Sequence, residues 1–175
     1  MMRCKKEDWP KFSVVILNYN GIEYIQACLE SVLNTNYPNF EVILVDNAST
    51  DGSLDLVRRI FGFHPHLKIV CNSRNLGFAE GNNIGAKHTK GEYIVFLNQD
   101  TKVDTRWLRE LVTVTEGNPR IAAAQCKLLL MDEPNHLDSA GHYMDRFGIG
   151  YPVGYHEEDK GQYDHVYEIF SVFGA

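Results

Sequence analysis

Four polar clusters in this sequence each follow directly after an apolar run. They begin at Asn18 ("NYNG"), Asp46 ("DNAST"), Asn72 ("NSRN") and Asn98 ("NQD"). Their carboxylates, amides and tyrosine ring are groups that can hold a polar ligand, and Asp100 supplies a hard oxygen for a cation. Asn, Asp, Gly and Ser are also ordinary turn residues, which explains any one cluster. Four clusters in succession favour a binding site.

The apolar runs that precede these clusters predict four strands. They cover residues 12–17, 40–45, 67–71 and 93–97, and they are continuous and mostly β-branched or aromatic, as in strands buried on both faces. Apolar residues recur at helical spacing between them, for example Ile25, Leu29 and Val32. Strands that alternate with helices predict an α/β fold with a mostly parallel sheet flanked by helices. The four clusters then meet at one edge, where open α/β sheets bind ligands.

The third connection carries Gly77, Gly81 and Gly85, four residues apart. On a helix they form a stripe without side chains, which lets the helix approach the sheet or a ligand closely. Each such glycine costs about 1 kcal/mol relative to alanine. A helix that is loosened by glycine and purely structural is the alternative.

The second half of the chain is less regular in pattern. A helix is predicted from a cap at Asp104 to Gly117, with Trp107, Leu108, Leu111 and Val112 facing inward, and a strand follows over residues 121–130. Residues 131–164 have the composition of loops. We expect one domain over residues 12–175, preceded by an N-terminal extension of residues 1–11.

Composition limits the classes of partner and the compartment. The chain has 175 residues and a formal net charge of −6, which argues against nucleic acid as a partner. The four cysteines form no C-x-x-C pair, so neither a disulfide framework nor a zinc site is indicated. The N-terminus is too charged for a signal peptide, and no apolar run approaches the length of a membrane span. These features predict a cytoplasmic protein with a small-molecule partner.

The common phosphate-binding motifs are missing. The sequence contains neither G-x-x-x-x-G-K-[ST] nor G-x-G-x-x-G after the first predicted strand. A phosphate-bearing ligand therefore needs another counter-charge, and a divalent cation, Mg²⁺ or Mn²⁺, held by Asp100 and by the ligand's own phosphate oxygens, would supply it.

Three segments together resemble a known family. "SVVILNYNG", "EVILVDNASTDGS" and "NLGFAEGNNIGAKHTKGEYIVFLNQDT", in this order, are similar to the amino-terminal half of family 2 glycosyltransferases, particularly the branch with rhamnosyltransferases. The resemblance runs from Phe12 to Val103 and weakly beyond. It implies the GT-A fold, a Rossmann-like parallel sheet, and transfer of a sugar from a nucleotide-diphosphate sugar.

The resemblance also implies positions for the donor-binding residues. The first two strand tips would hold the base and ribose of the nucleotide, and the segment from Gly77 would line the diphosphate. "NQD" stands where the family has its D-x-D motif, so Asp100 would be the metal ligand, whereas Asn98 replaces a frequent carboxylate. The implied contacts with the nucleotide sugar are Leu17, Asn18, Tyr19, Asp46, Asn47, Gly77, Asn82, Asn83, Asn98 and Asp100.

The implied mechanism is direct displacement at the anomeric carbon with inversion. A cation stabilises the departing diphosphate and a carboxylate base deprotonates the acceptor, a saccharide or a lipid-linked saccharide. The family places this base downstream of a Gly-Ala, and the sequence ends at "FGA", so we expect a C-terminally truncated domain that binds its donor and lacks the base. Asp138, Asp145 and Asp159 are the acids that could substitute.

The sequence and the resemblance also lead to expectations about the donor, the location of the protein and the class of function. Uridine or thymidine diphosphate sugars are favoured, because Asp46 could accept the imide N–H of either base. The resemblance implies polysaccharide synthesis at the inner face of the membrane, with peripheral membrane association through regions absent from this sequence. Two alternatives stay open, namely a sugar-phosphate nucleotidyltransferase and a non-catalytic nucleotide-binding module.

Overall fold

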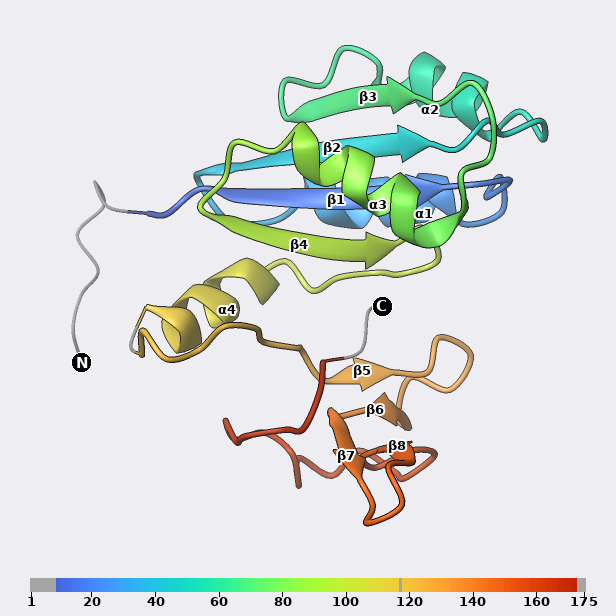
Figure 1. Ribbon diagram of the computed structural model, residues 1–175. Coiled ribbons are helices and arrows are strands. Elements are labelled where there is room, and N and C mark those ends of the chain that lie inside the picture. Colours follow the sequence, from blue (N-terminus) through green and yellow to red (C-terminus); the bar gives the residue numbers. More distant parts are fainter. Residues whose placement is uncertain (1–8, 117, 173–175) are drawn as a thin grey trace. The chain divides into compact units, whose positions relative to one another are not determined.

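A four-stranded sheet organises the first part of the chain in the computed structural model, which describes residues 9–116 and 118–172 (Figure 1). All strands are parallel, in the order β3-β2-β1-β4. The predicted α/β class with a mostly parallel sheet is therefore confirmed. The strands are β1 (Phe12–Asn18), β2 (Phe40–Asp46), β3 (Leu67–Cys71) and β4 (Tyr93–Asn98).

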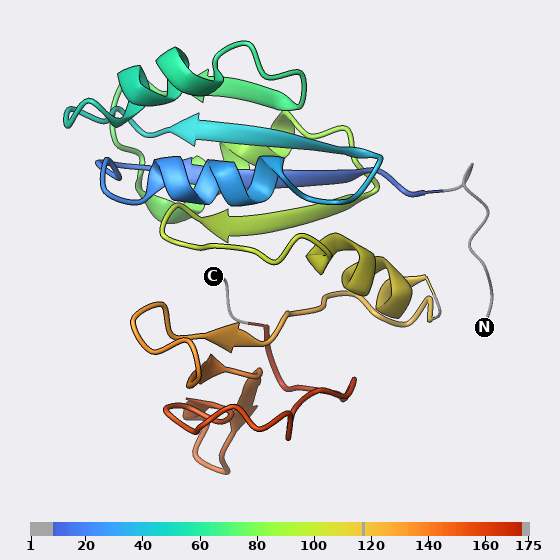
Figure 2. The same ribbon diagram turned by 180° about the vertical axis from the view of Figure 1, so that it is seen from behind.

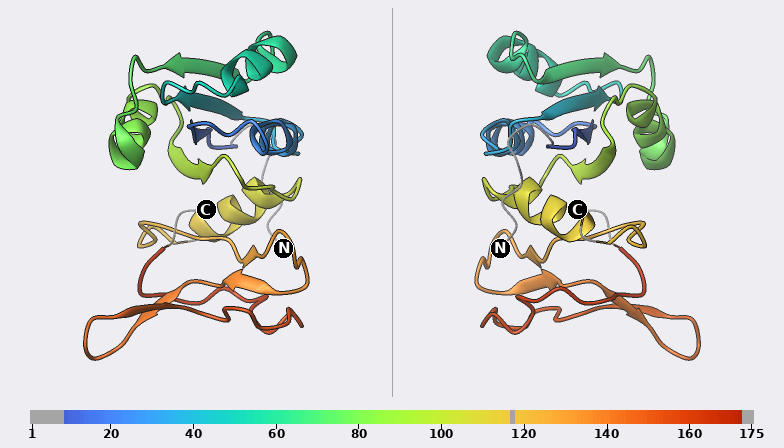
Figure 3. Two further views of the ribbon diagram at one scale, coloured as in Figure 1. Left: turned by 90° about the vertical axis from the view of Figure 1, so that its right-hand side faces the viewer. Right: turned by 90° about the vertical axis from the view of Figure 1, so that its left-hand side faces the viewer.

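Helices cover both faces of this sheet. α1 (Ile25–Leu33) and α2 (Ser53–Phe61) lie on one face, which Figure 2 shows in front, and α3 (Gly77–Lys87) lies on the other. Figure 3 shows the two helical layers from the end of the sheet. Successive side chains of a strand point to opposite faces. On the α3 face Val15, Ile43 and Val45 form a fully buried cluster, against which Ile84 packs.

Burial differs between the central and the edge strands. Nearly every residue of β1 and β2 is buried. The expectation that all four runs are buried on both faces is wrong for β3 and β4, where Ile94 and Phe96 remain 43% and 45% exposed. Both strands lie at an edge of the sheet, so each has only one neighbouring strand to cover it. An apolar run does not reveal its position in the strand order.

The glycine stripe has two functions along α3. A Cβ on Gly81 would lie 2.5 Å from Leu17 Cδ1, and one on Gly85 would lie 2.3 Å from Val15 Cγ1. The predicted close approach of this helix to the sheet is confirmed at these two positions. Gly77 differs, because nothing lies within 4 Å of its Cβ position, and its φ of +79° begins the helix in a conformation that favours glycine.

α4 (Trp107–Thr115) follows β4 after a short connection. It begins at Trp107, three residues after the predicted cap Asp104, whose Oδ1 accepts a hydrogen bond from the Arg106 backbone N–H at 2.8 Å in the turn before the helix. Trp107 Nε1 donates to Thr35 Oγ1 at 2.9 Å. This bond ties the start of α4 to the segment that follows α1. The predicted end of this helix at Gly117 and residues 1–8 of the expected extension lie outside the described residues.

The chain divides into two compact units, Met1–Arg109 and Glu110–Ala175. The second unit contains two antiparallel pairs, β5 (Leu128–Leu129) with β6 (Leu137–Ser139) and β7 (His142–Met144) with β8 (Gly150–Pro152). The predicted strand over residues 121–130 is wrong except at Leu128 and Leu129, because only these residues find a partner strand. The assignment of residues 12–175 to one nucleotide-sugar-binding domain stays a prediction.

Candidate functional site

A pocket of about 310 Å³ opens at the carboxyl edge of the sheet. The chain adds β2 and β3 on one side of β1 and then places β4 on the other side, so the order of the strands reverses at the boundary between β1 and β4. Open α/β sheets bind ligands at such a switch point. The pocket combines one carboxylate, four amides and two aromatic rings. Its lining residues are Leu17, Tyr19, Asn47, Asn75, Gly77, Phe78, Asn98, Gln99 and Asp100.

The structure brings part of the predicted set into this pocket. Leu17, Tyr19, Asn47, Gly77, Asn98 and Asp100 line it, whereas Asn18, Asp46, Asn82 and Asn83 do not. For the residues that line the pocket and for those that do not, a role in ligand binding stays a prediction. The parallel register explains the assembly, because Leu17 is paired with Asn98 and Asn18 with Asp46 at the ends of their strands.

Asn18 and Asp46 are the centre of a buried polar network beside the pocket. The side chain of Asn18 donates to Asp46 Oδ1 at 2.9 Å and to Ser53 Oγ at 2.9 Å. The other carboxylate oxygen of Asp46 accepts the Ser49 backbone N–H at 3.1 Å. Asp46 is only 1% exposed. In this structure the pair holds the loop after β2, and a contact of Asp46 with a base stays a prediction.

Asn47 connects the β2 tip to the loop that leads into α3. Its Nδ2 donates to Asn75 Oδ1 at 2.8 Å and to the Gly77 carbonyl at 3.2 Å. Its Oδ1 accepts from Asn72 Nδ2 at 3.0 Å and from the Leu76 backbone at 3.1 Å. These bonds use the full donor and acceptor capacity of a carboxamide. Asn47 therefore shapes the pocket wall, because it fixes the start of α3.

The two asparagines predicted within α3 lie elsewhere. Asn82 is buried and donates to the Phe78 carbonyl one turn earlier, at 3.1 Å. Asn83 is exposed on the same helix. Gly81, Ile84 and Gly85 form the side of the helix that packs on the sheet, and neither asparagine lines the pocket. The helix begins at the pocket, with Gly77 and Phe78, and then runs away from it.

Asp100 follows β4 at the rim of the pocket, next to Asn98 and Gln99. A carboxylate with neighbouring amide oxygens fits Mg²⁺ or Mn²⁺, which bind through one or two carboxylates and complete their shell with water and phosphate oxygens. Among residues 9–116 and 118–172 there is no cluster of three or more His, Cys, Asp or Glu side chains that could hold a metal ion.

A thiol lies beneath this rim. Cys28 Sγ contacts the Asn98 carbonyl oxygen at 3.6 Å and is fully buried. Burial raises its pKa to about 12, the Thr101 backbone hydrogen bond opposes this shift, and the negative charge of Asp100 adds to it. Cys28 is therefore a neutral thiol near neutral pH.

Three lining residues were absent from the predicted set, namely Asn75, Phe78 and Gln99. Asn75 and Gln99 belong to polar clusters that the sequence does reveal, so their position after a strand was available as a signal. Phe78 is 61% exposed. Its place beside Gly77, off the glycine stripe, is the only sequence feature that could have indicated an outward-facing ring.

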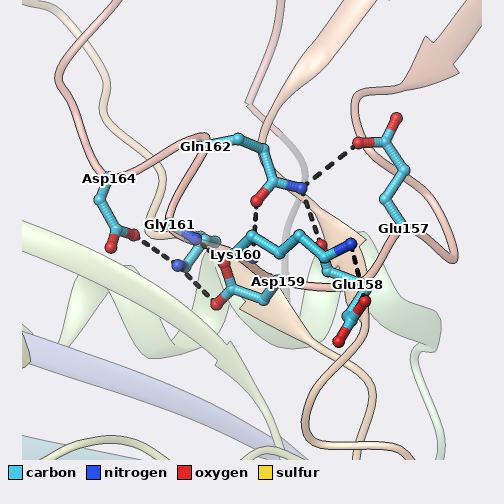
Figure 4. Close-up of polar contacts among 8 residues, drawn as sticks. Glu157, Glu158, Asp159, Lys160, Gly161, Gln162 and Asp164 are labelled. Atoms are coloured by element: carbon cyan, nitrogen blue, oxygen red, sulfur yellow. Dashed lines mark hydrogen bonds and ion pairs between the residues drawn. The ribbon is translucent and has the colours of Figure 1, made fainter.

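The three acids considered as the base belong to the second unit. Asp145 builds the β7–β8 turn, where its Oδ1 accepts the backbone N–H groups of Phe147 at 2.8 Å and Ile149 at 3.0 Å. Asp159 lies in the polar loop of Figure 4 and accepts from Lys127 Nζ at 2.7 Å. That hydrogen bond lowers the pKa of Asp159, which makes it a weaker proton acceptor. Asp138 is half-buried within β6.

Comparison with known proteins identifies the family. The model of the family described as "Glycosyl transferase family 2" matches residues 13–165. The chain belongs to glycosyl transferase family 2. A glycosyltransferase of Haemophilus influenzae without an assigned function is 33% identical over 117 residues, which cover 67% of this chain and 36% of the relative.

Two further relatives extend the comparison. The putative teichuronic acid biosynthesis glycosyltransferase TuaG of Bacillus subtilis is 33% identical over 93 residues, 53% of this chain and 37% of TuaG. The mannosyltransferase PcManGT from Pyrobaculum calidifontis, solved with GDP-Man and Mn²⁺, superimposes with a TM-score of 0.64 at 28% identity and covers 71% of this chain and 37% of that one.

These comparisons settle the fold. The predicted GT-A fold of family 2 glycosyltransferases is confirmed. The chain spans about a third of the length of the relatives it matches, at 36% and 37%. Within the part of the chain that the structure describes, no helix is both long and apolar enough to cross a membrane.

Proposed function

We propose that the enzyme containing this sequence transfers a sugar from a nucleotide-diphosphate sugar, with inversion, to a saccharide or lipid-linked acceptor. One observation carries the proposal: the pocket at the switch point places Tyr19 and Asp100 at the tips of the two adjacent strands β1 and β4. An aromatic ring suits a base and a carboxylate suits a cation on a diphosphate. Family membership supplies the reaction class.

The residues that line the pocket would serve three tasks in donor binding. Tyr19 and Leu17 offer an aromatic and an apolar surface to the base and ribose. Asp100, with the Asn98 amide, would hold a divalent cation, which when bound supplies positive charge for the departing diphosphate. The α3 start at Gly77 and Phe78 forms the wall on the phosphate side, where backbone N–H groups of a helix start favour anions. Uridine or thymidine diphosphate sugars are the proposed donors.

The proposal separates binding from transfer. The pocket lies within the first unit, Met1–Arg109. Asp145 and Asp159, in the second unit, already accept hydrogen bonds from neighbouring groups. We therefore expect the chain as given to bind the donor and to show transfer close to background, because the loss of a general base costs a factor of about 10²–10⁴. Acceptor-dependent release of nucleoside diphosphate at an enzyme-like rate would contradict this.

The biological setting is part of the same proposal. TuaG is named for a role in teichuronic acid synthesis, and a role of this protein in cell-surface polysaccharide synthesis, in the cytoplasm at the inner face of the membrane, is proposed by analogy. Acceptor-dependent transfer assayed with lipid-linked saccharides, by an enzyme of full family length, would test this part separately.

Asp100→Asn tests the cation site. The amide keeps the shape of the side chain and removes its charge, so the affinity for uridine diphosphate in the presence of Mn²⁺ should fall to the value measured without metal. Isothermal titration calorimetry with and without Mn²⁺ measures both. Asp104→Asn is the matched control, since Asp104 is also exposed but lies outside the pocket, in the turn before α4. Metal-dependent affinity that survives in Asp100→Asn would remove Asp100 from the site.

A further inference from the structure

The side chain of Gln99 makes a two-point contact with the backbone of Tyr19. Gln99 Oε1 accepts the Tyr19 N–H at 2.8 Å, and Gln99 Nε2 donates to the Tyr19 carbonyl at 3.2 Å. The last backbone pair of the β1–β4 ladder is Leu17 with Asn98. The carboxamide therefore extends the pairing of these two strands beyond their ends, across the switch point.

The neighbouring backbone leaves room for this carboxamide and no more. A Cβ on Gly21 would lie 2.5 Å from Gln99 Cδ and 2.6 Å from Gln99 Oε1. The loop after β1 is anchored on its other side as well, because Asn20 Oδ1 accepts the Thr50 backbone N–H at 2.8 Å. Tyr19 is thus held on one side by the loop after β2, through Asn20, and on the other by Gln99, directly after β4.

We infer that Gln99 is a positioning residue that fixes the ring of Tyr19 and the carboxylate of Asp100 relative to each other. The inference rests on the proposed function, in which Tyr19 receives the base and Asp100 the cation on the diphosphate. Gln99 contacts the backbone of Tyr19 and is the direct neighbour of Asp100. Both of these residues line the pocket. A ligand that bridges the two gains affinity when their separation is set before it binds.

Glutamine is the side chain that this contact requires. The pairing needs one donor and one acceptor at the end of a side chain of this length. Glutamate has the same shape but, when ionised, only accepts, so it would face the Tyr19 carbonyl with a like partial charge. Methionine keeps the approximate volume and removes both hydrogen bonds.

The test measures the cation enhancement, which is the ratio of uridine diphosphate affinities with and without Mn²⁺, by calorimetry on the full chain. For Gln99→Met we expect the enhancement to fall about tenfold, which corresponds to about 1.4 kcal/mol. Gln26→Met is the matched control, because Gln26 is a glutamine of α1 outside the pocket, exposed and bonded to Glu30. A purely structural Gln99 would lower the unfolding midpoint and leave the enhancement unchanged.

Gln99→Glu separates positioning from local charge. It adds a carboxylate beside Asp100, so charge alone would raise the cation enhancement, whereas positioning predicts a decrease. A second readout needs no ligand: hydrogen exchange at the Tyr19 amide should accelerate about tenfold in Gln99→Met and stay unchanged in Gln26→Met.

The results of these experiments distinguish a failure of the role of Gln99 from a failure of the proposed function. Cation enhancement within twofold of the unmodified chain in Gln99→Met, or an increase in Gln99→Glu, would overturn the inference and leave the proposed function standing. An unmodified chain without cation-dependent binding would overturn the proposed function, and the inference with it. Reduced enhancement in both variants together with faster Tyr19 exchange supports the inference.

Discussion

At the scale of single residues, hydrogen-bond capacity decides which amino acid a position accepts. Asn47 uses two donors and two acceptors, and both of its donors go to oxygens. An aspartate has the same shape but no N–H, so it would point an anionic oxygen at Asn75 Oδ1 and at the Gly77 carbonyl. Position 47 is therefore specific for the amide.

Asn47→Asp should lower the free energy of unfolding by about 1–3 kcal/mol, because a buried side chain loses both donor interactions. Urea denaturation measures the loss. Affinity for uridine diphosphate should also fall, since the start of α3 lines the pocket. Asn83→Asp, on the exposed side of α3, is the control and should change stability by less than about 0.5 kcal/mol. Equal stability of the two variants would show that the Asn47 bonds contribute nothing.

The sequence reveals which residues follow the strands and does not reveal which of them are accessible. Asn18 and Tyr19 are neighbours, yet Asn18 is fully buried and Tyr19 is 44% exposed. The difference arises because consecutive residues at a strand end point to opposite faces, and loops from β2 cover only one of them. Gln99 was visible in "NQD", but its pairing with a backbone 80 residues earlier depends on the strand order.

At the scale of elements, the distance between α3 and β1 depends on two glycines. The approach at Gly85 is the tighter one, since a Cβ there would lie 2.3 Å from Val15 Cγ1 and 3.1 Å from Val45 Cγ2. Both valines are fully buried, so neither can move aside cheaply. Alanine has the higher helix propensity by about 1 kcal/mol, and overpacking a core costs about 1–3 kcal/mol.

Gly85→Ala should therefore be destabilising despite its better helix propensity, by up to about 2 kcal/mol net. Thermal unfolding of the single variant and of Gly85→Ala combined with Val15→Ala provides the check. The second substitution removes the atom that the new methyl group meets, so the double variant should be more stable than the sum of the two single changes predicts. Strict additivity would contradict a direct contact.

A second contact between elements joins three segments at the amino edge of the sheet. Glu41, at the start of β2, accepts from Ser13 Oγ and from the Lys90 backbone N–H, both at 2.7 Å, and its other oxygen lies 2.9 Å from Lys11 Nζ. Partial burial by itself would raise its pKa, but these partners outweigh burial and lower the pKa below its ordinary value. The ionised form is therefore the form that stabilises the fold.

The lowered pKa of Glu41 makes the free energy of unfolding depend on pH. A lowered pKa in the folded state adds stability above the unfolded pKa of about 4.3, and this stability is lost as the pH falls through the folded pKa. Glu41→Gln should reduce the unfolding free energy by about 1–3 kcal/mol at pH 7, and its difference from the unmodified chain should shrink towards pH 3. Denaturation at several pH values measures this. A difference independent of pH, or one matched by the exposed control Glu23→Gln, would contradict it.

Element types were largely predictable, and strand order was not. The α/β pattern follows from local periodicity, which each segment carries by itself. The placement of β4 beside β1 and the short β5 depend on partners distant in the sequence. Residues 121–127 have strand-like composition but pair with no strand among the described residues, so propensity alone misassigned them.

At the scale of the whole molecule, the pocket belongs to the first unit and the candidate acids to the second. Within the second unit Lys127 Nζ bonds Asp159 Oδ2 at 2.7 Å and Asp164 Oδ1 at 2.5 Å. Burial alone would lower the pKa of Lys127, but the two carboxylates outweigh it and raise the pKa. The lysine thereby joins both ends of the loop drawn in Figure 4.

The division into two units predicts that this loop can be loosened without changing the pocket. Lys127→Met removes the cation between two aspartates, so repulsion should open the loop and accelerate exchange of the Gly161 and Asp164 amides about tenfold. Lys160→Met is the control, because Lys160 pairs with Glu158 at the exposed surface, where ion pairs contribute little. Uridine diphosphate affinity should stay within twofold of the unmodified chain in both variants. A large loss of affinity in Lys127→Met alone would show that the second unit takes part in donor binding, and the pocket of the first unit would then be only part of the site.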